Sequence, residues 1–246
     1  MSKSPSQAYH LYRWFWNGLD LLYPPVCGGC GRAGLRWCED CCHKAVTLPE
    51  PLCELCGLPR RTSGVCTACR SAPPPYRALR SWLVFEGPFR KALHRLKYRR
   101  DVGLGDALAA LLAEYASGLN WPVDLITPVP LSKKRLQERG YNQVALIARP
   151  LSLALGWRYT PRALARLRET ASQVGLSAEE RRKNVSGAFK ADASRVGGRT
   201  ILLVDDIATT GATLAACAQA LLVAGASDVY ALTAARALPR HGLKDV

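Results

Sequence analysis

The sequence predicts an α/β protein built on a mainly parallel sheet flanked by helices, preceded by a small cysteine-rich domain. From residue 82 onward, short apolar runs alternate with helical patterns, as expected of a parallel sheet. Nine of the ten cysteines, by contrast, lie within residues 27–69. The 246 residues are enough to bury a core, and the 48% hydrophobic content excludes wholesale disorder.

Eight of these cysteines form four C-x-x-C pairs, in which two thiolates on a tight turn converge on one metal ion. Gaps of seven and nine residues fit short hairpins, and so favour two zinc sites taken in sequence order. An interleaved pairing, first with third and second with fourth, has the same residue content. Iron–sulfur ligation and dithiol redox chemistry are the alternatives to structural zinc. The predicted ligands are Cys27, Cys30, Cys38, Cys41, Cys53, Cys56, Cys66 and Cys69.

Two further cysteines need a separate interpretation. Cys42, together with His43, could replace Cys41 as a ligand, although we expect both to be neighbours of a complete site. Cys217 lies in a small, apolar helical stretch, which indicates a buried core residue and no nucleophile.

The segments around the cysteines define the expected domain boundaries. Residues 9–23 would form a helix with an aromatic face, which either packs against the domain or stacks on nucleic acid bases. The prolines of residues 71–76 indicate a linker. We therefore expect an N-terminal helix in residues 1–26, a double zinc ribbon in 27–72 and the α/β domain in 77–246.

Neither a secretory signal peptide nor a membrane span is expected. The apolar stretch near the start is interrupted by Arg13, Asn17 and Asp20, and no small-residue cleavage site follows. The longest uncharged run, residues 207–227, contains many threonine, glutamine and glycine residues. A cytoplasmic location, where thiols stay reduced, is therefore expected.

The chain carries 34 Lys and Arg against 19 Asp and Glu, a formal net charge of +15. Residues 200–246 contribute none of this excess. Such a surplus favours a polyanionic partner or a phosphate-rich ligand, while a solvated basic face is the alternative interpretation.

The elements of the α/β domain follow from apolar patterning. Continuous apolar runs predict buried strands, and amphipathic runs predict the helices between them. In chain order, the expected elements are a strand at 82–85, a helix from Pro88, a helix at 104–116, a strand at 123–126, a helix at 144–155, a strand at 200–204, a helix at 214–223 and a strand at 229–233.

The most informative segment begins with the buried strand Ile201–Val204. Asp205 and Asp206 follow it, and then a small-residue turn with three threonines opens a helix. Backbone N–H groups at such a helix start form a phosphate cradle, and Gly211 permits close approach of the ligand. The carboxylates can accept hydrogen bonds from a vicinal diol and attract Mg²⁺. The site therefore fits a sugar that carries both a phosphate and a free diol.

Two further segments, both basic, fit a diphosphate. The loop Lys133–Arg139 has four cations after a strand, where open α/β sheets place ligands; a solvated surface loop is the alternative. In residues 168–187, a capping box formed by Ser177 and Glu180 precedes further cations. The cluster Lys97–Arg100 is expected to line the same cleft.

Residues 201–213 resemble, over all thirteen positions, the phosphoribosyl-diphosphate (PRPP) signature of type I phosphoribosyltransferases. The resemblance implies that fold for residues 77–246, with PRPP and Mg²⁺ as ligands, and it implies that Asp205 and Asp206 hold the ribose hydroxyls. Members that act on 6-oxopurines carry an aspartate base at the position of Thr209, which disfavours that activity. The residues implied for the 5′-phosphate are Ala208, Thr209, Thr210, Gly211, Ala212 and Thr213.

The leaving diphosphate would be neutralised by Mg²⁺ and by Arg135 and Arg139. In phosphoribosyltransferases a mobile hood closes near the point of the chain occupied here by residues 168–187. Further predicted substrate-binding residues are Lys97, Val129, Pro130, Lys134 and Tyr141.

The order of these motifs along the chain, from the cysteine pairs to the PRPP signature, resembles the ComF family. The resemblance runs from about Leu22 to Ala235 and implies a role in the uptake or use of single-stranded DNA, with DNA-processing proteins as partners. Two function classes remain. One is an enzyme that displaces diphosphate from PRPP, and the other is a nucleic-acid-binding or protein-docking module that uses the PRPP site as a sensor.

Overall fold

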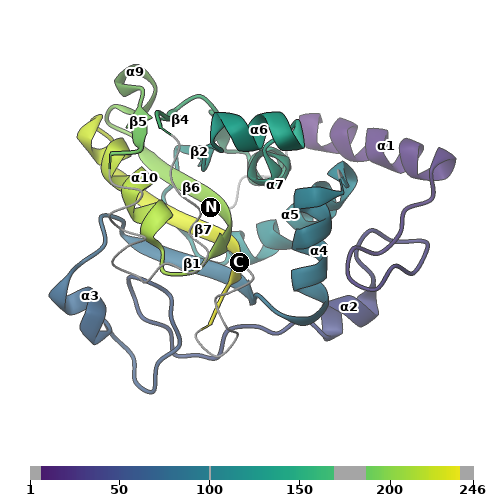
Figure 1. Cartoon of the computed structure of the whole chain (residues 1–246), viewed down its shortest axis with the longest axis horizontal. Helices are drawn as coiled ribbons and strands as arrows, with labels where there is room; N and C mark the ends of the chain where they lie inside the picture. The colour runs from purple at the N-terminus through teal and green to yellow at the C-terminus, as the bar shows by residue number, and fades with distance from the viewer. Residues whose placement is uncertain (1–6, 100, 169–186, 239–246) are drawn as a thin grey trace.

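A five-stranded parallel sheet forms the centre of the structure, with the strand order β1-β7-β6-β2-β3 (Figure 1). β6 (Thr200–Ala208) is the central strand, between β7 (Asp228–Arg236) and β2 (Leu125–Pro128). β1 (Ala78–Val84) and β3 (Arg158–Tyr159) form the two edges. The computed structural model describes residues 7–99, 101–168 and 187–238.

Helices cover both faces of this sheet, which confirms the predicted fold class. Alternate residues of β6 face the two layers: Leu202 and Val204 pack on one side, and Ile201 and Leu203 pack on the side of α10 (Ala212–Val223). Because both faces are covered, residues 201–204 of the strand are all apolar, as the sequence indicates. The helices of the first face are α4 (Gly87–Tyr98), α5 (Val102–Ser117) and α7 (Gln143–Leu155).

The basic segment after β2 is a helix, α6 (Lys133–Arg139), so its prediction as a loop is wrong. The Ser132 side chain caps this helix by accepting a hydrogen bond from the Arg135 N–H, and Gly140 ends it with a φ of +77°. The apolar periodicity that identifies a helix is missing because none of the residues of α6 is buried.

The first strand begins four residues earlier than expected, at Ala78. The polar residues Arg80 and Ser81 interrupt the apolar pattern in this part of the strand, so the sequence does not predict it. Each of them has a hydrogen-bond partner in the structure. The hydroxyls of Ser81 and Thr233 lie 2.7 Å apart, and Arg80 donates to the carbonyls of Cys53 and Glu54 in the cysteine-rich region.

Shorter elements complete the domain. An antiparallel pair, β4 (Leu164–Arg166) and β5 (Phe189–Ala191), lies outside the main sheet. It is followed by the short helix α9 (Ala193–Val196). The sequence did not predict these elements, because strands of three residues carry no periodic signal.

The N-terminal region packs along the outer edge of β1, which has no neighbouring strand of the sheet, and against the first helical layer. Backbone hydrogen bonds join Val84 N–H to the Val46 carbonyl and Leu79 N–H to the Leu55 carbonyl. The outer edge of the sheet is thereby covered by the cysteine-rich segments. The helices of this region are α1 (Gln7–Leu22), α2 (Glu39–His43) and α3 (Thr67–Ser71).

The aromatic helix α1 lies against α7 (Figure 1). Trp16 packs under the Arg36 guanidinium, 5.1 Å from the ring centroid, whereas Trp14 is 78% exposed. Only part of the aromatic face therefore serves for packing. Among the described helices, none combines the length and the apolar composition that a membrane span requires.

Candidate functional site

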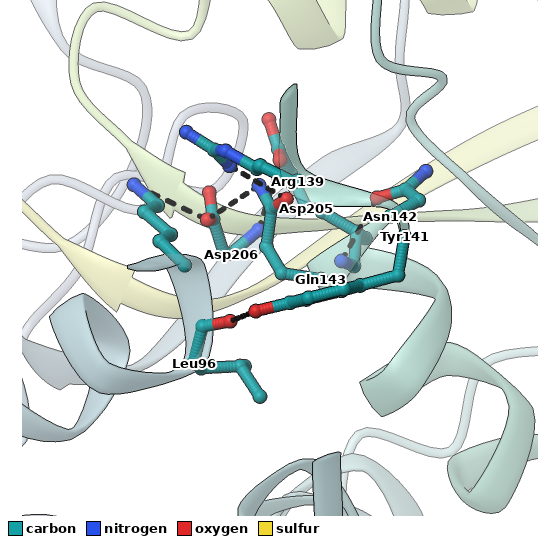
Figure 2. A network of polar contacts seen from close by, with 9 residues as sticks. Leu96, Arg139, Tyr141, Asn142, Gln143, Asp205 and Asp206 are labelled. Atoms are coloured by element: carbon teal, nitrogen blue, oxygen red, sulfur yellow. Dashed lines mark hydrogen bonds and ion pairs between the residues drawn. The ribbon is translucent and has the colours of Figure 1, made fainter. Parts of the chain in front are cut away.

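The two carboxylates expected to bind a sugar lie near the carboxyl end of β6, the central strand. Asp206 is 5% exposed, and its Oδ2 atom is 3.2 Å from Lys97 Nζ and 3.1 Å from Gln143 Nε2 (Figure 2). Asp205 is half-buried and accepts a hydrogen bond of 2.9 Å from the N–H of Asp206. The carboxylate pair is thus already in contact with a cation, Lys97, and a side-chain amide, Gln143.

The pKa values of the two carboxyl groups shift in opposite directions. Burial and the adjacent charge of Asp206 raise the pKa of Asp205 well above its ordinary value. Burial also acts to raise the pKa of Asp206, but Lys97, the Gln143 amide and Arg139 together lower it. Asp206 is therefore the member that ionises more readily, and Asp205 is the member that takes up a proton more readily.

Arg139, the last residue of α6, faces this pair. Its Nη1 donates to Gln143 Oε1 over 2.7 Å, and its guanidinium lies 5.1 Å from the ring centroid of Tyr98. Gln143, whose amide also donates to Asp206, therefore links the arginine to the carboxylate (Figure 2). Gln143 is absent from the site residues predicted from the sequence, although it ends the segment Arg139–Gln143, one of those that carry the family resemblance.

Tyr141 and Asn142 fix the segment that connects the strands to this site. The Tyr141 hydroxyl donates to the Leu96 carbonyl over 2.5 Å, which ties the start of α7 to α4 (Figure 2). Asn142 donates to the Val129 carbonyl over 3.0 Å and caps α7 by accepting from the Val144 N–H. These contacts hold Lys97 and Arg139, on different helices, close to the same carboxylate.

The loop from Ala208 to Thr213, called the β6–α10 loop below, follows directly on the carboxylates. Gly211 has a φ of +80° and stands at the N-cap of α10, as a turn with a left-handed residue requires. The Ala212 N–H donates to Thr210 Oγ1 over 3.3 Å. The loop thus presents the start of a twelve-residue helix beside Asp205 and Asp206.

The other predicted ligand-binding residues are distributed as follows. Lys134 and Arg135 are exposed on α6, and Pro130 is half-buried just before it. The expected hood in residues 169–186, with Ser177 and Glu180, lies outside the described residues, as does Arg100. The structure therefore brings together Lys97, Arg139, Tyr141, the carboxylates and the β6–α10 loop, while Arg135 projects from the preceding turn of α6 into solvent.

The cysteines form two separate four-sulfur clusters in sequence order. Within each cluster all sulfur atoms lie within 4.8 Å of one another, and the closest pairs are 3.5 to 3.9 Å apart. A tetrahedral zinc ion with Zn–S bonds of about 2.3 Å requires sulfurs about 3.8 Å apart. Both clusters fit zinc, and this grouping supports the sequential assignment. The first cluster is Cys27, Cys30, Cys38 and Cys41, and the second is Cys53, Cys56, Cys66 and Cys69.

Backbone N–H groups prepare one thiol in each cluster for metal binding. Burial acts to raise the pKa of Cys27 and of Cys53, but backbone N–H donors lower both to about 6. The Cys66 N–H, for example, lies 3.3 Å from the Cys53 sulfur. Cys42 is exposed and outside the first cluster, whereas Cys217 is buried, as expected of a core residue.

Comparisons with known proteins agree with this arrangement. Residues 18–70 match the model of the double zinc ribbon domain. A DNA utilization protein, YhgH, from Escherichia coli O6:H1 is 38% identical over 204 residues, which cover 80% of this chain and 89% of that protein. The chain belongs to the ComF family. Its relatives include competence protein ComFC of Bacillus subtilis, 29% identical over 90% of this chain and 89% of that protein.

Competence protein F of Haemophilus influenzae is a further relative of this ComF-family chain. It is 34% identical over 61% of this chain and 69% of its own length. Solved structures that match in part include a glutamine PRPP amidotransferase from B. subtilis, complexed with ADP and GMP. The match has a TM-score of 0.38 and 22% identity, and it covers 53% of this chain and 26% of that chain. An adenine phosphoribosyltransferase matches with a TM-score of 0.34, 20% identity and coverage of 55% and 73%.

Proposed function

We propose that this ComF-family protein binds PRPP at the carboxyl end of β6 and acts in the use of single-stranded DNA. One observation carries the first part. The carboxylate pair and the N-terminus of α10 lie on one continuous stretch, with Lys97 and Arg139 beside the carboxylates. PRPP has a diol, a 5′-phosphate and a diphosphate, and the site has a matching group for each.

The β6–α10 loop would hold the 5′-phosphate through its backbone N–H groups and threonine hydroxyls. Asp205 and Asp206 would accept hydrogen bonds from the ribose hydroxyls. The contacts from Lys97 and Gln143 go to the Oδ2 atom of Asp206. A ribose hydroxyl can therefore bind Oδ1 of Asp206 while the lysine remains in place.

Arg139 would contact the diphosphate, with Lys97 beside it and Lys134 and Arg135 one turn away on α6. Mg²⁺ bound with PRPP would further neutralise the leaving diphosphate. Asp205, a half-buried carboxylate of this site, would be an oxygen ligand for the ion. If the protein turns over, the bond from the anomeric carbon to the diphosphate breaks and a bond to an acceptor nucleophile forms. The acceptor can be sought by mass spectrometry, with PRPP supplied together with candidate bases and single-stranded DNA.

Calorimetry with PRPP and Mg²⁺ tests the binding site. The wild type should bind, and an Asp205→Ala/Asp206→Ala double variant should lose affinity by a factor on the order of 100 or more, because the ribose hydroxyls lose their acceptors and two charges are removed. Asp228→Ala, which removes a surface carboxylate paired with Arg77, is the matched control and should bind as the wild type does. Absence of binding by the wild type would contradict the proposal.

A second candidate function is direct binding of single-stranded DNA. The net charge of +15 and the exposed rings of Trp14 and Phe15 favour it, because strand-binding proteins combine cations with stacking surfaces. Fluorescence anisotropy of a labelled oligonucleotide should show an affinity that falls steeply with salt. Weak binding at low salt, or a flat salt dependence, would argue against this function.

We also propose that the protein works in the cytoplasm with DNA-processing proteins as partners. Its two four-cysteine clusters need reduced thiols, which a reducing compartment maintains.

A further inference from the structure

We propose that the second cluster (Cys53, Cys56, Cys66 and Cys69) positions the β6–α10 loop through Tyr76 and Leu79. Zinc at this cluster and a sugar phosphate at the loop would then stabilise each other. The inference rests on the proposed function, since it concerns the affinity of the same loop. Tyr76 and Leu79 are positioning residues in this proposal, and neither is assigned a contact with the ligand.

The second cluster packs against β1. The Leu79 N–H donates to the Leu55 carbonyl, between two of the ligands, over 2.7 Å. A Cβ on Gly57 would lie only 2.3 Å from the Leu79 carbonyl oxygen, so this turn packs directly on the strand. Arg80 adds hydrogen bonds to the Cys53 and Glu54 carbonyls. The turns that carry the ligands are therefore fastened to the first residues of β1.

Side chains at and just before the start of β1 pack against the β6–α10 loop. A Cβ on Gly211 would lie 3.2 Å from the Tyr76 hydroxyl and 3.8 Å from Leu79 Cδ2. Tyr76, Leu79, Ala208 and Ala212 belong to one buried hydrophobic cluster. Gly211, the residue with the left-handed conformation in the loop, thus rests on Tyr76 and on Leu79, and the second cluster fastens the backbone of Leu79. A shift of this support would change the direction of the loop N–H groups.

A buried positive charge makes the packing under the β6–α10 loop sensitive to zinc at the second cluster. Arg236 is 1% exposed, pairs in register with Ala208, and its Nε and Nη1 atoms have no hydrogen-bond partner among the described residues. Burial lowers the pKa of Arg236, while negative charge on the cluster cysteines Cys56, Cys69 and Cys53 opposes this effect. A zinc ion with four thiolates carries a net charge of about −2, which compensates a buried cation. Loss of the zinc site would leave Arg236 uncompensated behind the loop.

The first cluster offers a matched control because its contacts lead to α4 and α5 and not to the β6–α10 loop. Arg95 of α4 donates to the Cys27 carbonyl over 3.1 Å, and a Cβ on Gly28 would touch Leu104 and Ala92. These residues belong to α4 and α5, on the face of the sheet opposite α10.

The experiment compares the full-length, zinc-loaded variants Cys66→Ala and Cys30→Ala, each of which removes one of the less buried ligands of one cluster. The probe is ribose 5-phosphate, which carries the phosphate and the diol without the diphosphate. Cys66→Ala should weaken its binding by about tenfold, and Cys30→Ala by no more than about twofold. Equal loss in both variants, or no loss in Cys66→Ala, would overturn the inference.

Thermodynamic reciprocity provides a second readout that a merely structural role would not change. In Cys30→Ala, which retains the second site, saturating ribose 5-phosphate should slow zinc release to a chelator. In Cys66→Ala, which retains the first site, the ligand should have no effect on release. Tyr76→Ala should abolish the protection, and Tyr76→Phe, which keeps the ring in the buried cluster and removes only the hydroxyl next to Gly211, should retain part of it.

The outcomes separate this inference from the proposed function. If the wild type binds neither PRPP nor ribose 5-phosphate, both are wrong. If the wild type binds and zinc release is insensitive to the ligand, the site stands and only the coupling is overturned.

Discussion

The two four-cysteine clusters have the same spacing motif and similar sulfur geometry, yet they are attached to different parts of the molecule. Cys27, Cys38 and Cys41 belong to the large hydrophobic core that also contains Phe89 and Leu93 of α4. The second cluster forms a small hydrophobic group of its own and reaches the sheet mainly through backbone contacts with β1. One motif thus serves two purposes: the first cluster stabilises a helix, and the second supports a loop.

This difference extends into the candidate site. The helix behind the first cluster, α4, carries Lys97, which pairs with Asp206, and Tyr98, which packs against Arg139. The strand behind the second cluster contacts Gly211 through Leu79. The cationic side and the phosphate side of the site therefore rest on different metal clusters, and the following variants test this division.

The largest expected effect is on thermal stability. Cys41→Ala removes a ligand inside the main core and should lower the melting temperature by more than about 10 °C, because zinc binding supplies folding free energy and a core void is added. Cys69→Ala, the equivalent change in the second cluster, should cost distinctly less. Differential scanning calorimetry at matched zinc content measures both. A larger loss for Cys69→Ala would contradict the division of roles.

A smaller effect distinguishes the two carboxylates on the cationic side. The folded-state pKa of Asp206 is lowered, so its pairing with Lys97 adds stability above the unfolded pKa of about 4, and this stability is lost as pH falls through the folded value. The folded-state pKa of Asp205 is raised, so its ionisation opposes folding as pH rises above the unfolded value. At pH 7, Asp206→Asn should lower the melting temperature by about 3 °C and Asp205→Asn should raise it by a similar amount.

Melting temperatures of Asp206→Asn and Asp205→Asn, measured from about pH 3 to about pH 8, test this difference. This pH range includes the unfolded-state pKa of a carboxyl group. Both differences from the wild type should shrink toward the acidic end. Shifts of the same sign at neutral pH would show that the carboxylates do not differ in the way their surroundings indicate.

The smallest effect concerns the boundary of the first cluster. Cys42 is exposed and follows the ligand Cys41 directly. Cys42→Ala should retain two zinc ions per chain and change the free energy of unfolding by no more than about 0.5 kcal/mol. Zinc analysis by mass spectrometry measures this, and loss of one zinc ion would show that Cys42 is a ligand.

The sequence predicts the zinc ligands and the central strands well because these features depend on local spacing. Two thiols separated by two residues converge whatever surrounds them, and a strand buried on both faces must be apolar. The carboxylates and Gly211 follow from the same local segment, so the sequence also locates the core of the candidate site.

What the sequence does not predict depends on contacts between distant segments. Gln143 is a neutral amide whose role appears only when α6, α7 and β6 meet. Tyr76 follows three prolines that indicate a linker, yet it is buried under the β6–α10 loop. Arg236 is a polar residue at the end of a strand, and its burial near the second cluster follows from tertiary structure alone.

The proposed binding site is tested most stringently by a crystal structure of the zinc-loaded protein with PRPP and Mg²⁺. We expect the 5′-phosphate at the backbone N–H groups of residues 209–213, the ribose hydroxyls on Asp205 and Asp206, and the diphosphate beside Arg139. A saturated complex with the phosphates bound elsewhere on the chain would contradict this site.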